Sequence, residues 1–269
     1  MTGTARKPTY HDLLSDLKKF NQEKNFDVYV PSIGKNVKFK PLTVKQQKEL
    51  IKSGIDQRVQ NLSFVTLLNN IITDNLVDKG ATISTIDKSP IMIALRANSL
   101  PGELKLTVND EDVLIDIHTH VKSFSKHKFP EKKKTFTVSK GPIEVDGSIP
   151  TIDEDTVINK TFKKTFGGQK GDEQDIVITT IGEIFVYELV KYISKIRFAV
   201  EGQDQTEVDF KTLPPKQMVE LFETLPMSIS QLLINKVNEF KEFDSNFLTV
   251  MGPEGEVTIP VDVTLFASE

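Results

Sequence analysis

The 269-residue sequence contains no cysteine. Disulfide bonds, a thiolate nucleophile and cysteine-ligated zinc are therefore excluded. The sequence also lacks any apolar run close to the roughly 20 residues that a membrane-spanning helix needs. Residues 1–10 are polar and lack the apolar segment of a signal peptide. We therefore expect a soluble chain that is not exported and has no membrane partner.

The sequence carries little net charge. Its 34 basic and 38 acidic residues give a formal charge of −4 at pH 7, so the overall electrostatics give no reason to expect a nucleic-acid partner. Hydrophobic residues make up 38% of the chain, which is ordinary for a soluble globular protein. At this length the chain forms one large domain or two small ones.

Signatures of common catalytic sites are absent as well. The glycine-rich residues 167–171 lack the Gly-x-x-x-x-Gly-Lys-Ser/Thr order of a phosphate-binding loop. No Gly-x-Ser-x-Gly motif is present for an acyl-transfer serine. Acidic pairs such as Asp153 and Asp155 are common in loops and do not by themselves indicate acid–base catalysis. We expect no enzyme and no cofactor.

The clearest local pattern is a strand, a turn, a second strand and a helix near the start of the chain. Residues 26–30 alternate in polarity, and the alternation resumes after the turn. Pro31 fixes its own φ and Gly34 tolerates a positive φ, so the chain can reverse between them. Thr43 is a natural helix N-cap, and Gln46 completes a possible capping box.

This opening resembles that of the T4-type phage baseplate hub subunits and hub assembly proteins. The shared features are the Pro-Ser-x-Gly turn, here residues 31–34, and the Pro-Leu-Thr that precedes the helix, here residues 41–43. Relatives also end in a small hairpin followed by a segment similar to residues 259–266 of this chain. In some of them the hairpin turns look like cysteine pairs suited to a zinc ribbon, whereas the turn at residues 251–255 has no cysteine.

The resemblance covers the two ends of the chain and little of its middle. It implies a non-enzymatic structural component of a contractile-tailed phage baseplate hub, located in the virion tail baseplate and acting through protein–protein contacts. The alternative is a tail or baseplate assembly chaperone that works in the host cytoplasm and is absent from the mature virion. In both cases the partners would be other phage tail or baseplate proteins, and association between copies of this chain stays open.

The pattern of apolar residues predicts an α+β fold: an N-terminal β-hairpin with helices, a β-rich middle insertion, and a helical C-terminal part ending in a β-hairpin. Ser89 is expected to cap one of the helices, ahead of Pro90. Beyond the helix after Thr43, helices are predicted at residues 10–20, 62–76, 91–98, 181–198, 215–223 and 226–240. Strands are predicted at residues 103–108 and 113–121 and on both sides of residues 251–255. The predicted parts are residues 1–102 (α/β), 103–175 (a β-rich, lysine-rich insertion or arm) and 176–269 (helical, with the terminal hairpin).

A candidate metal site lies in the middle segment. Alternation places Asp116, His118 and His120 on one face of the predicted strand at residues 113–121. Two histidines and a carboxylate can bind zinc or iron, so a metal-dependent enzyme centred on the two histidines is a further alternative function. A polar, solvent-facing strand edge explains the same residues, and we favour that interpretation.

A lysine-rich stretch follows. Residues 122–140 hold seven lysines and a single acidic residue, Glu131, with three phenylalanines between them. Basic residues among aromatic ones can bind single-stranded nucleic acid. Alternatively, the lysines contact an acidic partner, or the acidic residues 146–155 of this chain or of a neighbouring copy. We favour a protein contact, for which the candidate residues are Lys126, Lys128, Phe129, Lys132, Lys133 and Lys134.

Overall fold

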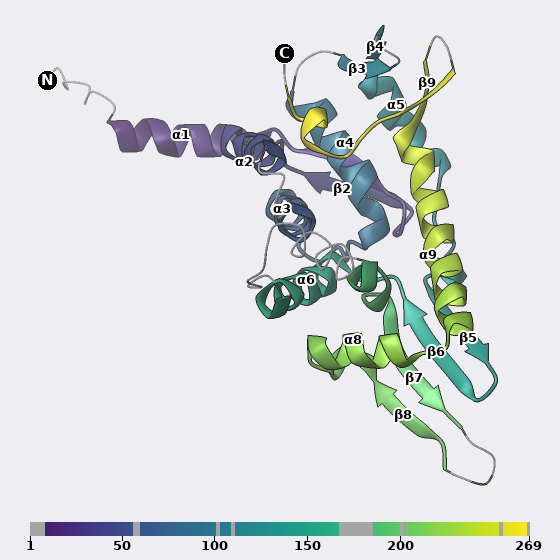
Figure 1. Cartoon of the computed structure of the whole chain (residues 1–269). Coiled ribbons are helices and arrows are strands. Elements are labelled where there is room, and N and C mark those ends of the chain that lie inside the picture. Colours follow the sequence, from purple (N-terminus) through teal and green to yellow (C-terminus); the bar gives the residue numbers. More distant parts are fainter. Residues whose placement is uncertain are drawn as a thin grey trace, which may run out of the picture.

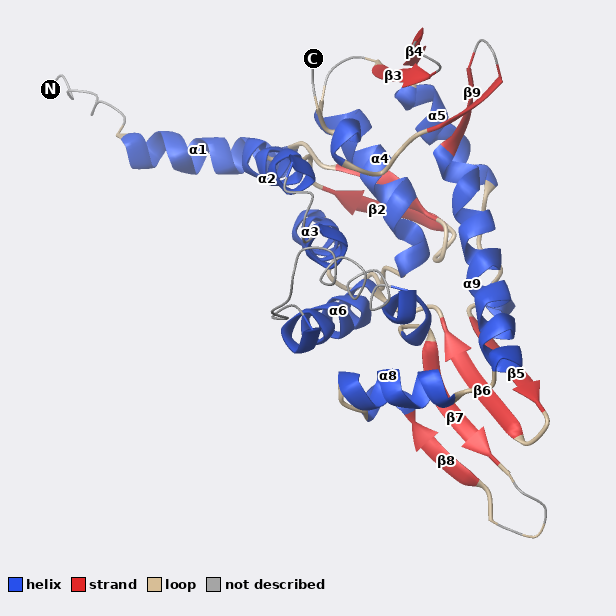
Figure 2. Cartoon of the chain, in the orientation of Figure 1, coloured by secondary structure: helices blue, strands red, loops and turns tan. Residues whose placement is uncertain are grey.

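The structure is a computed structural model. It describes residues 9–55, 60–100, 103–108, 111–166, 185–199, 202, 204–252 and 255–267. These residues form a mixture of helices and small antiparallel sheets (Figures 1 and 2). The predicted fold class is confirmed: an N-terminal hairpin with helices, a central sheet, and a helical C-terminal part that ends in a hairpin.

The N-terminal hairpin forms as the sequence predicts. β1 (Phe26–Val30) pairs antiparallel with β2 (Lys35–Phe39), and alternate side chains of both strands are buried. In the turn, the backbone N–H groups of Ile33 and Gly34 donate to the carbonyl oxygen of Val30 at 3.1 and 2.8 Å. Gly34 has a φ of 71°, which glycine adopts without steric cost.

Three helices follow the hairpin: α2 (Val44–Ile55), α3 (Gln60–Asn75) and α4 (Lys88–Ser99). The predicted capping box of α2 is confirmed, because Gln46 N donates to Thr43 Oγ1 at 3.2 Å and Thr43 N donates to Gln46 Oε1 at 2.9 Å. α4 is buried on all sides between residues 90 and 97, so it forms the centre of this half of the molecule.

The start of α4 differs from the prediction. The helix begins one residue before Ser89, which therefore lies in the first turn and is not the N-cap. The Ser89 hydroxyl donates instead to Asp244 Oδ2 at 2.7 Å. This bond ties the first turn of α4 to the long C-terminal helix.

Two further hairpins lie at one end of the molecule (Figure 1). β3 (Leu104–Val108) pairs with β4 (Glu111–Ile115), and β9 (Thr249–Gly252) pairs with β10 (Gly255–Thr258). Both were predicted. β4 is shorter than predicted, because α5 (Ile117–Ser123) starts two residues after it ends.

A four-stranded antiparallel sheet lies at the opposite end, in the order β5-β6-β7-β8. Its strands are β5 (Thr135–Lys140), β6 (Ile143–Ser148), β7 (Ile193–Phe198) and β8 (Thr206–Asp209). The sheet joins residues from both sides of the predicted boundary at residue 175. The predicted division into three parts stays a prediction.

The helix predicted over residues 181–198 is wrong in its second half. Residues 185–190 are helical, but β7 follows, and residues 181–184 lie outside the described residues. The register between β6 and β7 shifts at Asp146 and Gly147, where Gly147 pairs with Ile193 and Asp146 with Lys195. Because of this irregularity, Ser194 has no register partner in β6. Ile193 and Ile196 are therefore both buried, although they are three residues apart. Apolar residues three positions apart are typical of a helix, so this strand has the sequence pattern of a helix.

Later in the chain lie the helices α6 (Ile152–Phe166), α8 (Pro215–Thr224) and α9 (Met227–Leu248). The predicted helix at residues 215–223 is confirmed, and α9 continues eight residues past the predicted end at residue 240. The buried apolar residues form two clusters, one around α4 and the N-terminal hairpin and one around the four-stranded sheet. α9 contributes to both clusters, and its Phe243 packs against each of them.

α1 (Tyr10–Glu23) extends away from the rest of the molecule (Figure 1). The predicted amphipathic helix is confirmed, and a capping box between Thr9 and Asp12 begins it. Two of its leucines stay in solvent: Leu13 is 58% exposed and Leu17 is 51% exposed. α1 therefore contributes little to either core.

The two kinds of leucine give a test of this arrangement. Leu50→Ala should lower the free energy of unfolding by about 2–5 kcal/mol, because Leu50 of α2 is fully buried. Leu17→Ala should change it by less than about 0.5 kcal/mol, because the Leu17 side chain lies in solvent. Urea unfolding followed by circular dichroism measures both. Equal losses would contradict the exposed position of α1.

Candidate partner interface

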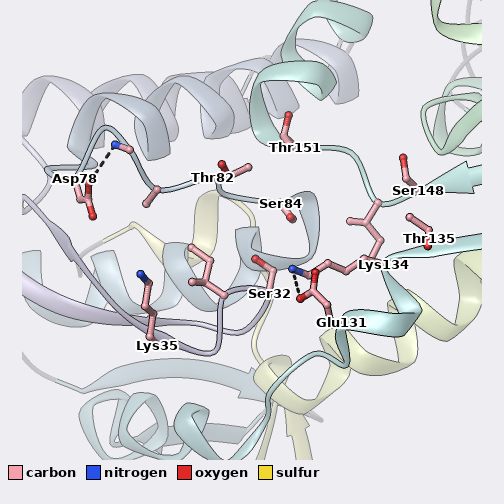
Figure 3. Close-up of a pocket in the computed structure, with 14 residues that line it drawn as sticks. Ser32, Lys35, Asp78, Thr82, Ser84, Glu131, Lys134, Thr135, Ser148 and Thr151 are labelled. Carbon is pink, nitrogen blue, oxygen red and sulfur yellow. Dashed lines mark hydrogen bonds and ion pairs between the residues drawn. The ribbon is translucent and has the colours of Figure 1, made fainter.

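A pocket of about 630 Å³ opens beside the N-terminal hairpin (Figure 3). Four segments that are distant in the sequence form its walls: the turn after β1, the loop before α4, the residues before β5, and the residues between β6 and α6. Most of its lining residues are polar, and six of them carry a hydroxyl group. The polar side chains labelled in Figure 3 are Ser32, Lys35, Asp78, Thr82, Ser84, Glu131, Lys134, Thr135, Ser148 and Thr151.

The buried carboxylate of Asp87 fixes two of these walls. Asp87 Oδ1 accepts from Ser32 N at 2.8 Å, and Oδ2 accepts from Ser32 Oγ at 2.6 Å and from Ser84 N at 2.8 Å. Asp87 is fully buried, so no solvent competes for these bonds. The turn that carries Ser32 and the loop that carries Ser84 are thus held at a fixed separation.

The other walls are held by backbone bonds and by a helix cap. Ile149 N donates to the carbonyl oxygen of Lys134 at 2.9 Å, which joins the wall before β5 to the wall after β6. Thr151 N donates to Glu154 Oε2 at 2.8 Å, and Glu154 N donates to Thr151 Oγ1 at 3.1 Å, which caps α6. The pocket is therefore built from rigid segments.

The lysine-rich stretch runs along the N-terminal hairpin next to this pocket. Phe129 N donates to the carbonyl oxygen of Pro31 at 3.1 Å. The carbon stem of Lys128 lies against Gly34, so close that a Cβ on Gly34 would come within 2.6 Å of it. This contact places Lys128 beside Lys35, the residue that follows Gly34.

Most of the predicted lysines are exposed at this surface. Lys126, Lys128, Lys132 and Lys133 are exposed, whereas Lys134 is partly buried and pairs with Glu131 at 2.7 Å. Lys133 approaches Glu239 at 3.9 Å. Within the described residues, Lys35, Lys126, Lys128 and Lys132 form no ion pair. We call these four residues the lysine surface.

Within the described residues, none of the acidic residues 146–155 pairs with the lysine surface: Asp153 forms no ion pair, and the other three carboxylates pair elsewhere. Asp146 binds Arg197 at 2.7 Å, and Glu154 binds Lys211 at 2.7 Å. Asp155 binds Lys88 of α4. The alternative in which the two stretches pair within one chain is therefore not observed.

Phe129, the sixth predicted contact residue, lies in the interior. Its side chain is only 2% exposed, and its ring packs edge-on against Phe243 of α9 with the centroids 4.8 Å apart. The ring of Phe240 lies 6.0 Å away. Phe129 therefore anchors the lysine-rich stretch to α9 and is not available to a partner.

Asp116, His118 and His120 are not brought together. The strand predicted at residues 113–121 gives way to α5, and Asp116 caps that helix by accepting from Thr119 N at 3.0 Å. Two residues along a helix correspond to a rotation of about 200°, so the two histidines point to different sides. The sequence signal was an aspartate able to act as an N-cap, which outweighed the alternation.

The two histidines also differ in environment. His118 is exposed, whereas His120 is buried and its Nε2 lies 2.7 Å from the carbonyl oxygen of Phe247. Burial lowers the pKa of His120. Among the residues that the structure describes, no set of three His, Cys, Asp or Glu side chains is arranged to hold a metal ion. The prediction that Asp116, His118 and His120 share one face of a strand, on which the metal-centred alternative depended, is therefore wrong.

Asp155 forms a second buried polar cluster, which joins α3, α4, α6 and the helix at residues 185–190. Its oxygens accept from Lys88 Nζ, from the Tyr187 hydroxyl, and from Asn69 Nδ2 at 2.8 Å. Burial raises the pKa of Asp155, but the Lys88 ammonium and the other donors outweigh it, so the pKa lies below its usual range. These groups connect helices and line none of the pockets described.

The family model described as T4 bacteriophage base plate protein matches residues 22–245. The chain belongs to this family. No curated protein and no solved structure matches it.

Membership in the base plate family makes this chain a structural baseplate component whose contacts are with other phage tail proteins. The match includes the N-terminal hairpin, the lysine-rich stretch and all four walls of the pocket. It ends within α9, so residues 259–266, which carry the C-terminal part of the resemblance, lie outside it. No helix in the described ranges combines the length and the apolar character needed to cross a membrane.

Sequence reasoning missed Asp87 and the pocket. A signal for Asp87 was present, because Ser84 and Asp87 form the Ser-x-x-Asp pattern of a capping box ahead of an apolar run. The pocket itself leaves no local signal, because its walls come from four separate segments.

We expect the change of aspartate to asparagine to have opposite effects on protein stability at Asp87 and at Asp244. Burial raises the pKa of each carboxyl group to about 6, and the charge of Asp87 raises the pKa of Asp244 further. A raised pKa in the folded state means that this contribution to stability is complete below about pH 4 and is lost as the pH rises through 6.

Asp244→Asn should therefore stabilise the protein at pH 8, and its advantage should shrink by about 2 kcal/mol on going to pH 4. Within the described residues, Asp244 accepts only from Ser89, and its Oδ1 has no hydrogen-bond partner. Asp87→Asn should instead destabilise the protein, by about 1–3 kcal/mol at pH 8, because an amide NH₂ would face the donors of Ser32 or Ser84. The loss should be larger at pH 4, where the raised pKa of Asp87 stabilises the unsubstituted protein.

Chemical denaturation of both variants at the two pH values measures these differences. A gain in stability for Asp87→Asn at pH 8 would contradict its role in holding the pocket walls.

Proposed function

We propose that this chain is a non-enzymatic component of the baseplate hub that acts through protein–protein contacts in tail assembly. The observation that carries the proposal is the rigid polar pocket with the lysine surface beside it. One wall of this pocket is the hairpin turn at residues 31–34, which resembles the corresponding turn of the hub proteins. A preformed surface loses little conformational freedom on binding, which favours its use as a docking site.

The use of the chemically reactive side chains supports a role without catalysis. Both oxygens of Asp87 are occupied by backbone and hydroxyl donors, Asp116 caps a helix, and His120 is bonded to a backbone carbonyl group. Groups engaged in this way hold the fold together and are not free to exchange protons with a substrate.

The exposed helix α1 supports a role in assembly. A helix of this length is marginally stable alone in water, and its Leu13 and Leu17 lie in solvent in the isolated chain. Contacts with other tail proteins would bury this face. The alternative function is an assembly chaperone that makes similar contacts but leaves before the virion is complete.

Composition of the particle separates these two functions. Mass spectrometry of purified phage particles and of infected-cell lysate, with peptides unique to this chain, should find it in the particles at a fixed low copy number. Presence in the lysate alone would favour the chaperone and contradict a hub subunit. Abundant tail proteins in the same samples serve as the control for recovery.

A further inference from the structure

We propose that the pocket and the lysine surface together bind an extended acidic segment of a partner protein. This inference deepens the proposed function by naming the chemistry of the partner, and it rests on that function. The pocket would take part of the segment, and the lysine surface would attract its carboxylates.

The pocket has the size and the lining for a peptide. Ligand sites in proteins commonly enclose about 300–1,000 Å³, and this pocket encloses about 630 Å³. Within the described residues, the hydroxyl groups of Thr82, Thr135 and Ser148 make no hydrogen bond, although all three line the pocket (Figure 3). Each hydroxyl can donate to a peptide carbonyl group or accept from a peptide N–H group.

The lysine surface, and not the pocket lining, selects acidic partners, because the lining itself also holds the carboxylates of Asp78 and Glu131. Lys35 lies in the pocket wall, and Lys128 lies against the neighbouring Gly34. Lys126 and Lys132 are exposed in the same stretch, on either side of Lys128 in the sequence, and none of the four has an ion-pair partner in the described part of the chain. The nearby Glu131 is already bound to Lys134. An acidic segment would therefore meet unpaired positive charge along one side of the pocket.

The same geometry favours protein over nucleic acid. Single-stranded nucleic acids bind by stacking their bases on exposed aromatic rings beside basic residues. Phe124 and Phe129, the phenylalanines nearest to the lysine surface in the sequence, are 0% and 2% exposed. The ring of His127 packs edge-on against Phe247. The lysines thus offer charge without a surface for base stacking.

The test uses the purified full-length chain and a fluorescein-labelled peptide of about ten residues in which glutamate and serine alternate. Fluorescence anisotropy at low ionic strength measures binding. Thr135→Trp should weaken binding at least about tenfold by filling the pocket from an exposed position. The double change Lys126→Glu and Lys132→Glu should have an effect of similar size through charge.

Two controls keep the result specific. The double change Lys140→Glu and Lys216→Glu alters the net charge equally at exposed residues outside the pocket and the lysine surface, and it should leave binding within about twofold. A single-stranded thymidine oligonucleotide of equal charge should bind at least about tenfold more weakly than the peptide. Circular dichroism confirms that each variant is folded.

Each contrary outcome overturns the inference. Absence of peptide binding excludes the site, and an unchanged affinity in Thr135→Trp removes the pocket from it. Equal or tighter binding of the oligonucleotide would assign the lysines to nucleic acid. A chain that is present in phage particles but does not bind the peptide would leave the proposed function intact and overturn this inference alone.

Discussion

The buried carboxylate of Asp87 is the interaction on which the architecture of the proposed interface depends. It accepts hydrogen bonds from the turn after β1 and from the loop before α4, and so it joins two segments more than fifty residues apart. A buried carboxylate without these donors would be costly, and the donors without the carboxylate would be left unpaired. The three groups therefore stabilise one arrangement, in which the turn of the N-terminal hairpin and the loop before α4 form two sides of the pocket.

The rest of the interface follows from how the lysine-rich stretch is attached. Phe124 and Phe129 are buried in the core while the lysines between and after them face solvent. The stretch is thus fixed at intervals by apolar side chains and presents charge between them. Such an arrangement holds a basic surface in place without ion pairs of its own, which leaves its charge available to a partner.

Local signals predicted most of the elements. The alternation of the N-terminal hairpin, the capping box at Thr43 and Gln46, and the prolines that open α8 and α9 all act over a few residues, and the structure confirms them. The helix predicted at residues 181–198 failed for a reason of longer range. The register shift between β6 and β7 gave a strand the apolar spacing of a helix.

The candidate site was less predictable than the fold. The exposed lysines could be identified from composition, but the burial of Phe129 depends on a row of aromatic side chains supplied by α9. The tie between Ser32 and Asp87 likewise depends on contacts that no sequence window contains. A capping aspartate at residue 116 was enough to turn a predicted strand into a helix and to separate the two histidines.

The length of α9 has a mechanical consequence. Its 22 residues span about 33 Å, and its side chains enter both hydrophobic clusters without an intervening loop. A force applied to the terminal hairpin would be transmitted along the helix axis to the four-stranded sheet, with no flexible joint to absorb it. The helix therefore couples the two ends of the molecule rigidly. A displacement of the terminal hairpin by a neighbouring protein would also displace the four-stranded sheet.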